Sequence, residues 1–376
     1  MDARITFAAF RCKKYVQMKY HPPIDLPDDN EMKATIFQGP GKIEVHEVPD
    51  PVIQKPDEAI VKVIYTTICG SDLWYYRGLS PLEIGTHIGH EFMGTVEAVG
   101  DGVNKVRVGD MVVAPFVISD DTCPECRVGM TRFCRNGRFW GTGGYDGGQG
   151  EKARLPMADG TLRVVPKSNI DDHMMRALLA LSDVMSTGHH AAVCAEVGMG
   201  STVAVIGDGA VGLCAVAASK RLGASRIFLI STHEDRAKIG QRFGATDIIS
   251  ARGNEAIRSV KALTNDLGVD SGLECVGTAE AWNTTLGMVR IGGNVGFVGV
   301  PHEVPDISVS KLFNSGIGVK GSGASAGHYI RELMPDVLSG KLDVSDIFTK
   351  TIPLSDIAEG YRDMDERKEI KVLVRP

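Results

Sequence analysis

Two short motifs in the first third of the sequence carry residue types that bind a soft metal. The first contains Cys69, followed by Ser71 and Asp72, and the second contains His90, followed at once by Glu91. A thiolate and an imidazole suit zinc, which acts as a Lewis acid on an alcohol or carbonyl oxygen. The motifs therefore predict a catalytic metal site. The competing interpretation is that a lone cysteine in a strand is only a small buried side chain.

A glycine-rich motif lies downstream. Gly207, Gly209 and Gly212 follow an apolar segment and precede a helix-forming one. Gly207 permits a turn, Gly209 lets the backbone approach a pyrophosphate, and Gly212 allows close packing of helix on strand. The pattern alone is weak and also fits a tight turn without a ligand. Between an expected strand and helix it predicts a dinucleotide site, and a metal beside a dinucleotide indicates hydride transfer.

Bulk composition narrows the class of protein. The 376 residues exceed what one hydrophobic core normally supports, which predicts two domains. The net charge of −6, with no block of basic residues, argues against a nucleic-acid partner and favours a small-molecule substrate. No apolar run approaches the roughly 20 residues of a membrane span. Eight cysteines without a signal peptide, three of them clustered, favour metal binding in a reducing compartment, so we expect a soluble, cytoplasmic protein.

The pattern of apolar residues divides the chain. Residues 1–31 read as a poorly ordered extension, with a transit peptide or a start codon upstream of Met32 as alternatives. Short alternating segments then predict a β-rich domain, and after residue 184 strands and helices alternate, which predicts a parallel sheet. We expect domains at 32–184 with 326–376, and at 185–325. The expected elements are strands at 58–65, 94–100, 202–206, 226–230, 272–275, 293–300 and 370–374, and helices at 210–222, 234–243 and 330–338.

From Met32 onward, the order of these motifs resembles the zinc-dependent medium-chain alcohol dehydrogenases. The resemblance implies an α/β protein with a GroES-like β-rich catalytic domain and a Rossmann domain with a doubly wound parallel sheet. It also implies a catalytic zinc held by Cys69, His90 and a third ligand at Asp183, as in the formaldehyde-dehydrogenase branch. A carboxylate in place of a thiolate keeps the ligand charge unchanged. Alternatively, Asp183 only caps the helix that follows it.

The same resemblance implies a second, structural zinc in a cysteine-rich lobe. Cys123, Cys126 and Cys134 match three of the family's four ligands, and Asp120 stands where relatives have the first cysteine. Three thiolates leave tetrahedral zinc one ligand short. Either Asp120 or Asp121 must therefore supply an oxygen, or the lobe holds no metal. We expect an occupied site with Asp120, because exposed, closely spaced free thiols are open to oxidation.

Several neighbours of the expected ligands match family residues with known roles. Ser71 matches the hydroxyl that relays the substrate proton, and Asp72 matches the partner that fixes the tautomer of the ligand histidine. Glu91 matches a buried carboxylate near the metal, with either a catalytic or a structural role. Trp74 stands where many relatives have a relay histidine, which leaves the proton exit to water or the cofactor ribose. Trp74 is expected to line the substrate pocket, and so is Phe116 unless it is a plain core residue.

The cofactor contacts are carried over in the same way. Four residues match positions at the nicotinamide or the pyrophosphate, although each could be ordinary packing or surface charge: Thr187, Val211, Val298 and Lys371. NAD enzymes have an acidic residue at position 231, where this chain has Ser231. With His233 and Arg236 nearby, the loop offers donors to a 2′-phosphate and favours NADP over NAD. Against this, Ser231 and Glu234 also form a capping box, Glu234 could turn toward the ribose, and Arg236 has a counterpart in NAD-using relatives.

The sequence thus predicts a zinc-dependent oxidoreductase that interconverts an alcohol and an aldehyde or ketone with NADP or NAD. Same-fold alternatives are polyol, amino-alcohol and formaldehyde-type dehydrogenases. An alternative of another class is a catalytically silent redox or metal sensor that keeps the cofactor site. Relatives are commonly dimers or tetramers, so we expect a homo-oligomer.

Overall fold

The structure is a computed structural model that describes residues 31–141, 144–166, 170–301 and 307–376. The expected extension at 1–31 lies outside the described residues, apart from Glu31. Within the described part, no helix combines the length and the apolarity that crossing a bilayer requires. The expected boundaries between domains stay predictions, but the two large sheets that they imply are both present.

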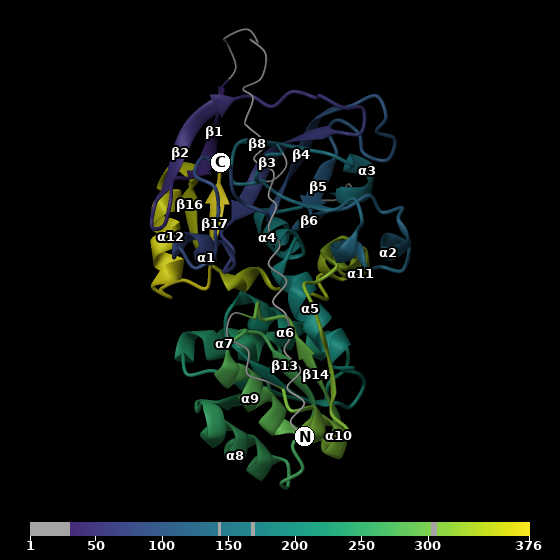
Figure 1. The fold of residues 1–376 in the computed structure, drawn as a ribbon, viewed down its shortest axis with the longest axis vertical. Helices are drawn as coiled ribbons and strands as arrows, with labels where there is room; N and C mark the ends of the chain where they lie inside the picture. Colours follow the sequence, from purple (N-terminus) through teal and green to yellow (C-terminus); the bar gives the residue numbers. More distant parts are fainter. Residues whose placement is uncertain (1–30, 142–143, 167–169, 302–306) are drawn as a thin grey trace, which may run out of the picture. The chain divides into compact units, whose positions relative to one another are not determined.

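The first sheet has seven strands and is mostly antiparallel. Its order is β16-β17-β3-β4-β5-β9, with β8 also paired to β3. The C-terminal strand β17 pairs with β3, and in Figure 1 it lies in yellow beside strands from the amino-terminal half. The strands are β3 (Ala59–Thr67), β4 (Phe92–Val99), β5 (Met111–Ala114), β8 (Lys152–Leu155), β9 (Arg163–Val164), β16 (Phe348–Pro353) and β17 (Lys371–Arg375).

Smaller elements surround this sheet. Two antiparallel pairs, β1 with β2 and β6 with β7, lie outside it. Their bounds are β1 (Glu31–Phe37), β2 (Ile43–Pro49), β6 (Val117–Ile118) and β7 (Arg138–Phe139). The helices of this part are α1 (Asp72–Tyr76), α2 (Pro124–Arg127), α3 (Ala158–Thr161), α4 (Asp172–Ala180), α11 (Ala326–Leu338) and α12 (Ile357–Asp365).

The second sheet has six parallel strands in the order β12-β11-β10-β13-β14-β15, the strand order of the Rossmann fold. The strands are β10 (Thr202–Ile206), β11 (Arg226–Ile230), β12 (Asp247–Ile249), β13 (Val269–Glu274), β14 (Val289–Phe297) and β15 (Gly318–Gly321). The connecting helices are α5 (Val184–Cys194), α6 (Ala210–Arg221), α7 (Glu234–Phe243), α8 (Gly253–Leu263), α9 (Ala279–Met288) and α10 (Val309–Ser315).

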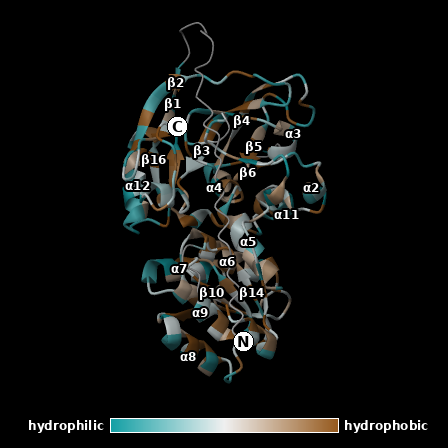
Figure 2. Cartoon of the chain, in the orientation of Figure 1, coloured by the Kyte–Doolittle hydropathy of each residue, from teal (hydrophilic) through white to brown (hydrophobic). Residues whose placement is uncertain are grey.

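Burial explains why these strands lack polar alternation. Helices cover both faces, so β10 and β11 are buried on both sides and read as continuous apolar runs. One core cluster joins β10 to α5 and α6, and a second joins its other face to α8 and α9. Figure 2 shows hydrophilic residues on the outer parts of α7 and α8. The architecture confirms the predicted α/β class.

Candidate active site

Three segments far apart in the sequence converge beside the first sheet. Cys69 follows the end of β3, and His90 directly precedes β4, which pairs antiparallel with β3 so that Thr66 faces Phe92. This register places the end of one strand beside the start of the other. Asp183 joins them from the N-terminal end of α5. The fold therefore brings together the three predicted ligands of the catalytic metal.

The ligand atoms have the spacing of a zinc site. Asp183 Oδ2 lies 3.5 Å from Cys69 Sγ and 3.6 Å from His90 Nε2, and candidate ligand atoms of these residues and Glu91 all lie within 4.8 Å of one another. Zinc bonds of 2.0–2.3 Å in tetrahedral geometry place ligand atoms about 3.5 Å apart. The Asp183 side chain makes no capping hydrogen bond to α5, which argues against the capping alternative. The residues present therefore fit zinc.

The charge of the cluster also suits a cation. Burial, together with the nearby Asp183 and Glu91, raises the pKa of the Cys69 thiol to about 11. Burial lowers the pKa of His90, but the neighbouring Asp72, Cys69 and Asp183 raise it well above its usual value, so the cluster favours positive charge at this place. Once Cys69 is deprotonated, its thiolate and the carboxylates of Asp183 and Glu91 share this space with the ammonium of Lys371. A divalent cation would offset this excess of negative charge.

Asp72 orients the ligand histidine. Its Oδ1 lies 3.3 Å from His90 Nδ1, which leaves Nε2 directed at Asp183. The Asp72 carboxylate also accepts hydrogen bonds from the backbone N–H of Cys69 at 3.0 Å and from Gln149 Nε2 at 3.3 Å. Ser71 Oγ lies 3.4 Å from His90 Nε2, beside the expected metal position. The geometry thus brings Ser71 and Asp72 to the site, and their roles in proton relay and in fixing the tautomer stay predictions.

Sequence reasoning missed Gln149 and Tyr361. Gln149 Nε2 donates to Asp72, and its Oε1 accepts from the Tyr361 hydroxyl at 3.0 Å. The available signal was the run of glycines around Gln149. A Cβ on Gly147 would lie 2.2 Å from the carbonyl oxygen of Ile88, so the backbone here packs directly against the segment before His90.

Glu91 and Lys371 form a buried ion pair behind the cluster. Lys371 Nζ lies 2.7 Å from Glu91 Oε1 and donates to the Ile68 carbonyl at 3.2 Å, and both side chains are within 1% of complete burial. Thr187 Oγ1 donates to Asp183 Oδ1 at 2.7 Å. In this structure Thr187 and Lys371 contact the carboxylates of the cluster, and their nucleotide contacts stay predictions.

The two aromatic residues predicted for the substrate pocket lie on different elements. The Phe116 ring meets the His90 ring edge-on, with centroids 6.5 Å apart. Trp74 lies half-buried on α1, three residues after Ser71. Phe116 therefore flanks the metal cluster directly, and the pocket role of Trp74 stays a prediction.

The glycine motif forms a turn suited to a pyrophosphate. It follows β10, at the point where the strand order reverses between β10 and β13. Gly207 has φ of +113°, and a Cβ on Gly212 would lie 1.9 Å from the Gly207 carbonyl oxygen, so neither position tolerates a side chain. A Cβ on Gly209 would meet nothing within 4 Å, which leaves open space above the N-terminus of α6. Val211 lies in the first turn of that helix, and Val298 packs at the end of β14. This cradle fits a dinucleotide.

The loop after β11 differs from its sequence-based interpretation. The expected capping box is not formed, because α7 has His233 as its N-cap without a side-chain cap, and Ser231 Oγ donates instead to Asp208 Oδ2 at 2.7 Å. Glu234 is exposed and pairs with Lys238 at 2.8 Å, so it does not turn toward Ser231. Sequence reasoning missed Asp208, whose only signal was its place between two glycines of the motif.

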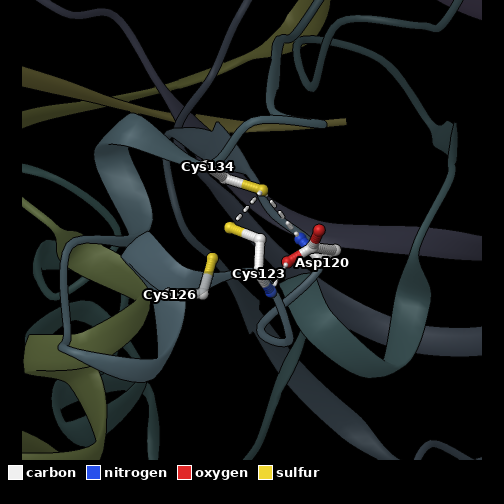
Figure 3. A group of neighbouring side chains, drawn as sticks. All are labelled: Asp120, Cys123, Cys126 and Cys134. Atoms are coloured by element: carbon white, nitrogen blue, oxygen red, sulfur yellow. Dashed lines mark hydrogen bonds between the residues drawn. The ribbon is translucent and has the colours of Figure 1, made fainter.

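The cysteine-rich lobe is a second metal-type cluster (Figure 3). Asp120, Cys123, Cys126 and Cys134 bring candidate ligand atoms within 4.8 Å of one another. Burial would raise the pKa of Asp120, but hydrogen bonds from the backbone of Cys123 and of Thr122 hold it well below its usual range.

The structure also distinguishes the two candidate aspartates of the lobe. Asp121 adopts φ of +58° and pairs with Arg331 and, at 3.8 Å, with Arg163. Asp120 is therefore the aspartate that lies with the thiols, in a tetrad whose composition fits structural zinc.

A group of Cys, His and Asp side chains that fits zinc, in a chain that also has a Rossmann sheet with a glycine turn suited to a dinucleotide, has the features of a metal-dependent dehydrogenase. Residues 55–167 match the family model described as alcohol dehydrogenase GroES-like domain, and residues 210–339 match the model described as zinc-binding dehydrogenase. The chain belongs to the zinc-dependent medium-chain dehydrogenase family.

Individual relatives agree over nearly the whole chain. A probable zinc-binding alcohol dehydrogenase of Mycobacterium tuberculosis is 36% identical over 352 residues, covering 92% of this chain and 89% of that protein. The structure of an alcohol dehydrogenase from Thermus sp. ATN1 is 35% identical, with a TM-score of 0.85 over 92% of this chain and 99% of that one. A Sinorhizobium meliloti structure bound to NADP is 27% identical, with a TM-score of 0.80 over 93% of this chain and 100% of that one. Other relatives are named butanediol and formaldehyde dehydrogenases.

Proposed function

We propose that this chain interconverts an alcohol and its aldehyde or ketone, with zinc held by Cys69, His90 and Asp183 and a nicotinamide nucleotide held at the glycine motif. The observation that carries the proposal is the meeting of these three ligand types, whose candidate ligand atoms lie within 4.8 Å of one another. When bound, zinc supplies Lewis-acid polarisation of the substrate oxygen, and the nicotinamide ring accepts or donates the hydride.

The chain's own residues orient the zinc ligands, transfer the substrate proton and shield the site from water. Asp72 holds the His90 ring so that Nε2 faces the cluster, and Asp183 is itself fixed by Thr187. Ser71 Oγ lies beside His90 Nε2, where it is placed to take the proton of the substrate hydroxyl and pass it on. Phe116 covers one side of the cluster, which keeps water away from the reacting atoms.

The choice between NAD and NADP depends on the loop after β11. The sequence alone favours NADP through Ser231, His233 and Arg236, whereas all three of these side chains contact the Asp208 carboxylate. Those contacts favour NAD.

Substitution of Cys69 tests the ligand assignment. Cys69→Ala should lose one of two zinc ions per chain and nearly all turnover, because even the loss of a residue that only orients a ligand lowers metal affinity or activity about 10- to 100-fold. Zinc content is measured by elemental analysis, and turnover by nicotinamide absorbance at 340 nm over a panel of primary, secondary, polyhydroxy and amino alcohols together with formaldehyde. Cys194→Ala, which removes another buried thiol of the chain, is the matched control and should keep both properties. Near-normal turnover in Cys69→Ala would refute the assignment.

The panel also separates the remaining alternatives. Preferred oxidation of polyols, amino alcohols or formaldehyde would narrow the substrate within the same chemistry. A protein that binds zinc and nucleotide yet turns over none of the panel would support the redox or metal sensor instead.

We further propose that the chain forms a homo-oligomer through the open edge of the second sheet. In the described residues β15 is the edge strand of this sheet; its partner strand β14 carries the exposed Ile291, and the helix before β15, α10, carries the exposed Val309 and Phe313, the last of them 86% exposed. Apolar side chains gathered beside an unpaired strand edge favour association. Light scattering should show a dimer or tetramer that Phe313→Asp dissociates, while Met199→Asp, at another exposed apolar position, leaves it intact.

We also propose that the chain functions in a reducing compartment, such as the cytoplasm. It is supported by the cysteines of the described residues, all of which are free thiols.

A further inference from the structure

Position 231, at the end of β11, is where a Rossmann enzyme for NAD places its ribose-binding carboxylate. In this chain the residue is Ser231, which has no carboxylate, but a carboxylate is nevertheless present. Ser231 is only 3% exposed, and its Oγ lies 2.7 Å from Asp208 Oδ2. Asp208 comes from the glycine motif at the end of β10, and β10 pairs in parallel with β11 so that Ile206 faces Ile230. The register thus delivers an acidic group from the neighbouring strand.

The donors that could bind a 2′-phosphate are already engaged by this carboxylate. His233 Nδ1 lies 2.7 Å from Asp208 Oδ2, and Arg236 Nη1 lies 3.5 Å from Oδ1. Arg236 Nη2 also donates to the carbonyl of Arg367 at 3.2 Å. A phosphate would have to displace Asp208 from these partners and would leave two anions side by side.

The carboxylate still has room to accept another hydrogen bond. Two carboxylate oxygens offer about four acceptor sites, and the contacts of Asp208 use two on Oδ2 and one long contact on Oδ1. The side chain is 15% exposed, so one edge faces outward. Burial would raise the pKa of Asp208, but hydrogen bonds from His233 and Ser231 lower it, which keeps the group ionised at neutral pH.

We propose that Asp208 is the residue that accepts a hydroxyl of the adenosine ribose and makes NAD the preferred nucleotide of this chain. The inference rests on the proposed dinucleotide site. It assigns the choice of nucleotide to a residue of the glycine motif, in place of the residue that ends β11.

Fluorescence titration of NADH and NADPH tests this proposal without any substrate. Wild type should bind NADH more tightly than NADPH. Asp208→Asn, which keeps the size of the side chain, should lower the affinity for NADH about 10-fold and raise the affinity for NADPH by a similar factor. One hydrogen bond to a charged group changes a binding constant by about 10-fold or more. Asp208→Ser is a second, smaller variant that should shift the ratio in the same direction.

Arg252 provides the matched control. Its Nη2 donates to Thr232 Oγ1 at 2.8 Å on the exposed rim of the same loop. Arg252→Ala should leave the NADH:NADPH ratio within about 2-fold of wild type. A tighter wild-type affinity for NADPH, or an unchanged ratio in both Asp208 variants, would overturn the inference while nucleotide binding itself persists. If neither nucleotide binds to wild type, the dinucleotide site fails, and with it both proposals.

Discussion

Removing the Lys371 ammonium should destabilise the fold far more than removing an exposed lysine. Its partner Glu91 is completely buried; Lys371 contacts Glu91 Oε1, and Glu91 Oε2 has no hydrogen-bond partner in the described residues. Breaking a buried pair by deleting one member costs about 3–5 kcal/mol, because it leaves an uncompensated charge. Lys371→Met, which retains the aliphatic stem, should therefore lower the folding equilibrium constant by about 1000-fold.

Guanidinium unfolding at a fixed zinc concentration measures this loss. Lys238→Met is the control, because the Glu234–Lys238 pair is exposed and should contribute less than about 1 kcal/mol. The double variant Glu91→Gln with Lys371→Met should recover a substantial part of the loss, since no unpaired ion is then buried. A cost for Lys371→Met no larger than that of Lys238→Met would refute the buried ion pair.

Three other perturbations have distinct expected outcomes. Gly212→Ala should lower both the melting temperature and the NADH affinity, because its Cβ would clash with the Gly207 carbonyl oxygen. Gly209→Ala, whose Cβ has open space, should lower the NADH affinity alone. Thermal unfolding and NADH titration distinguish the two variants. Burial lowers the pKa of His190 to about 4, so as the pH falls below about 6.5 the unfolded chain binds a proton that the folded chain does not. Between pH 7 and pH 5 the free energy of unfolding of wild type should therefore fall by about 2 kcal/mol more than that of His190→Gln, measured by guanidinium unfolding. Equal pH dependence of these two proteins would contradict that assignment. Cys126→Ser should reduce zinc from two ions per chain to one while turnover persists, and an unchanged zinc content by elemental analysis would show that the lobe holds no metal.

Local sequence patterns predicted four of the six strands of the second sheet and missed the short strands β12 and β15. The strands at 202–206 and 226–230 and the helix at 234–243 have the predicted bounds, because each is a buried apolar run or an amphipathic period ended by glycine or a polar turn. The closing strand was one residue off, at Lys371–Arg375. Helix α8, a strongly amphipathic segment, was not predicted at all.

The candidate site was predictable only where a motif carries its own chemistry. The residue types and spacing of Cys69 and His90 indicate a metal site, and the structure brings the two side chains together. The partnership of Ser231 with Asp208 was not readable, because it depends on the register of two strands and on a loop contact 23 positions apart. The predicted capping box was wrong for the same reason, since the carboxylate competes for the serine hydroxyl.

The ion pair between Glu91 and Lys371 joins residues 280 positions apart. During synthesis on the ribosome, Glu91 emerges long before its cationic partner exists. The ion pair can therefore form only after the last strand of the chain, β17, has been made and has joined the first sheet beside β3.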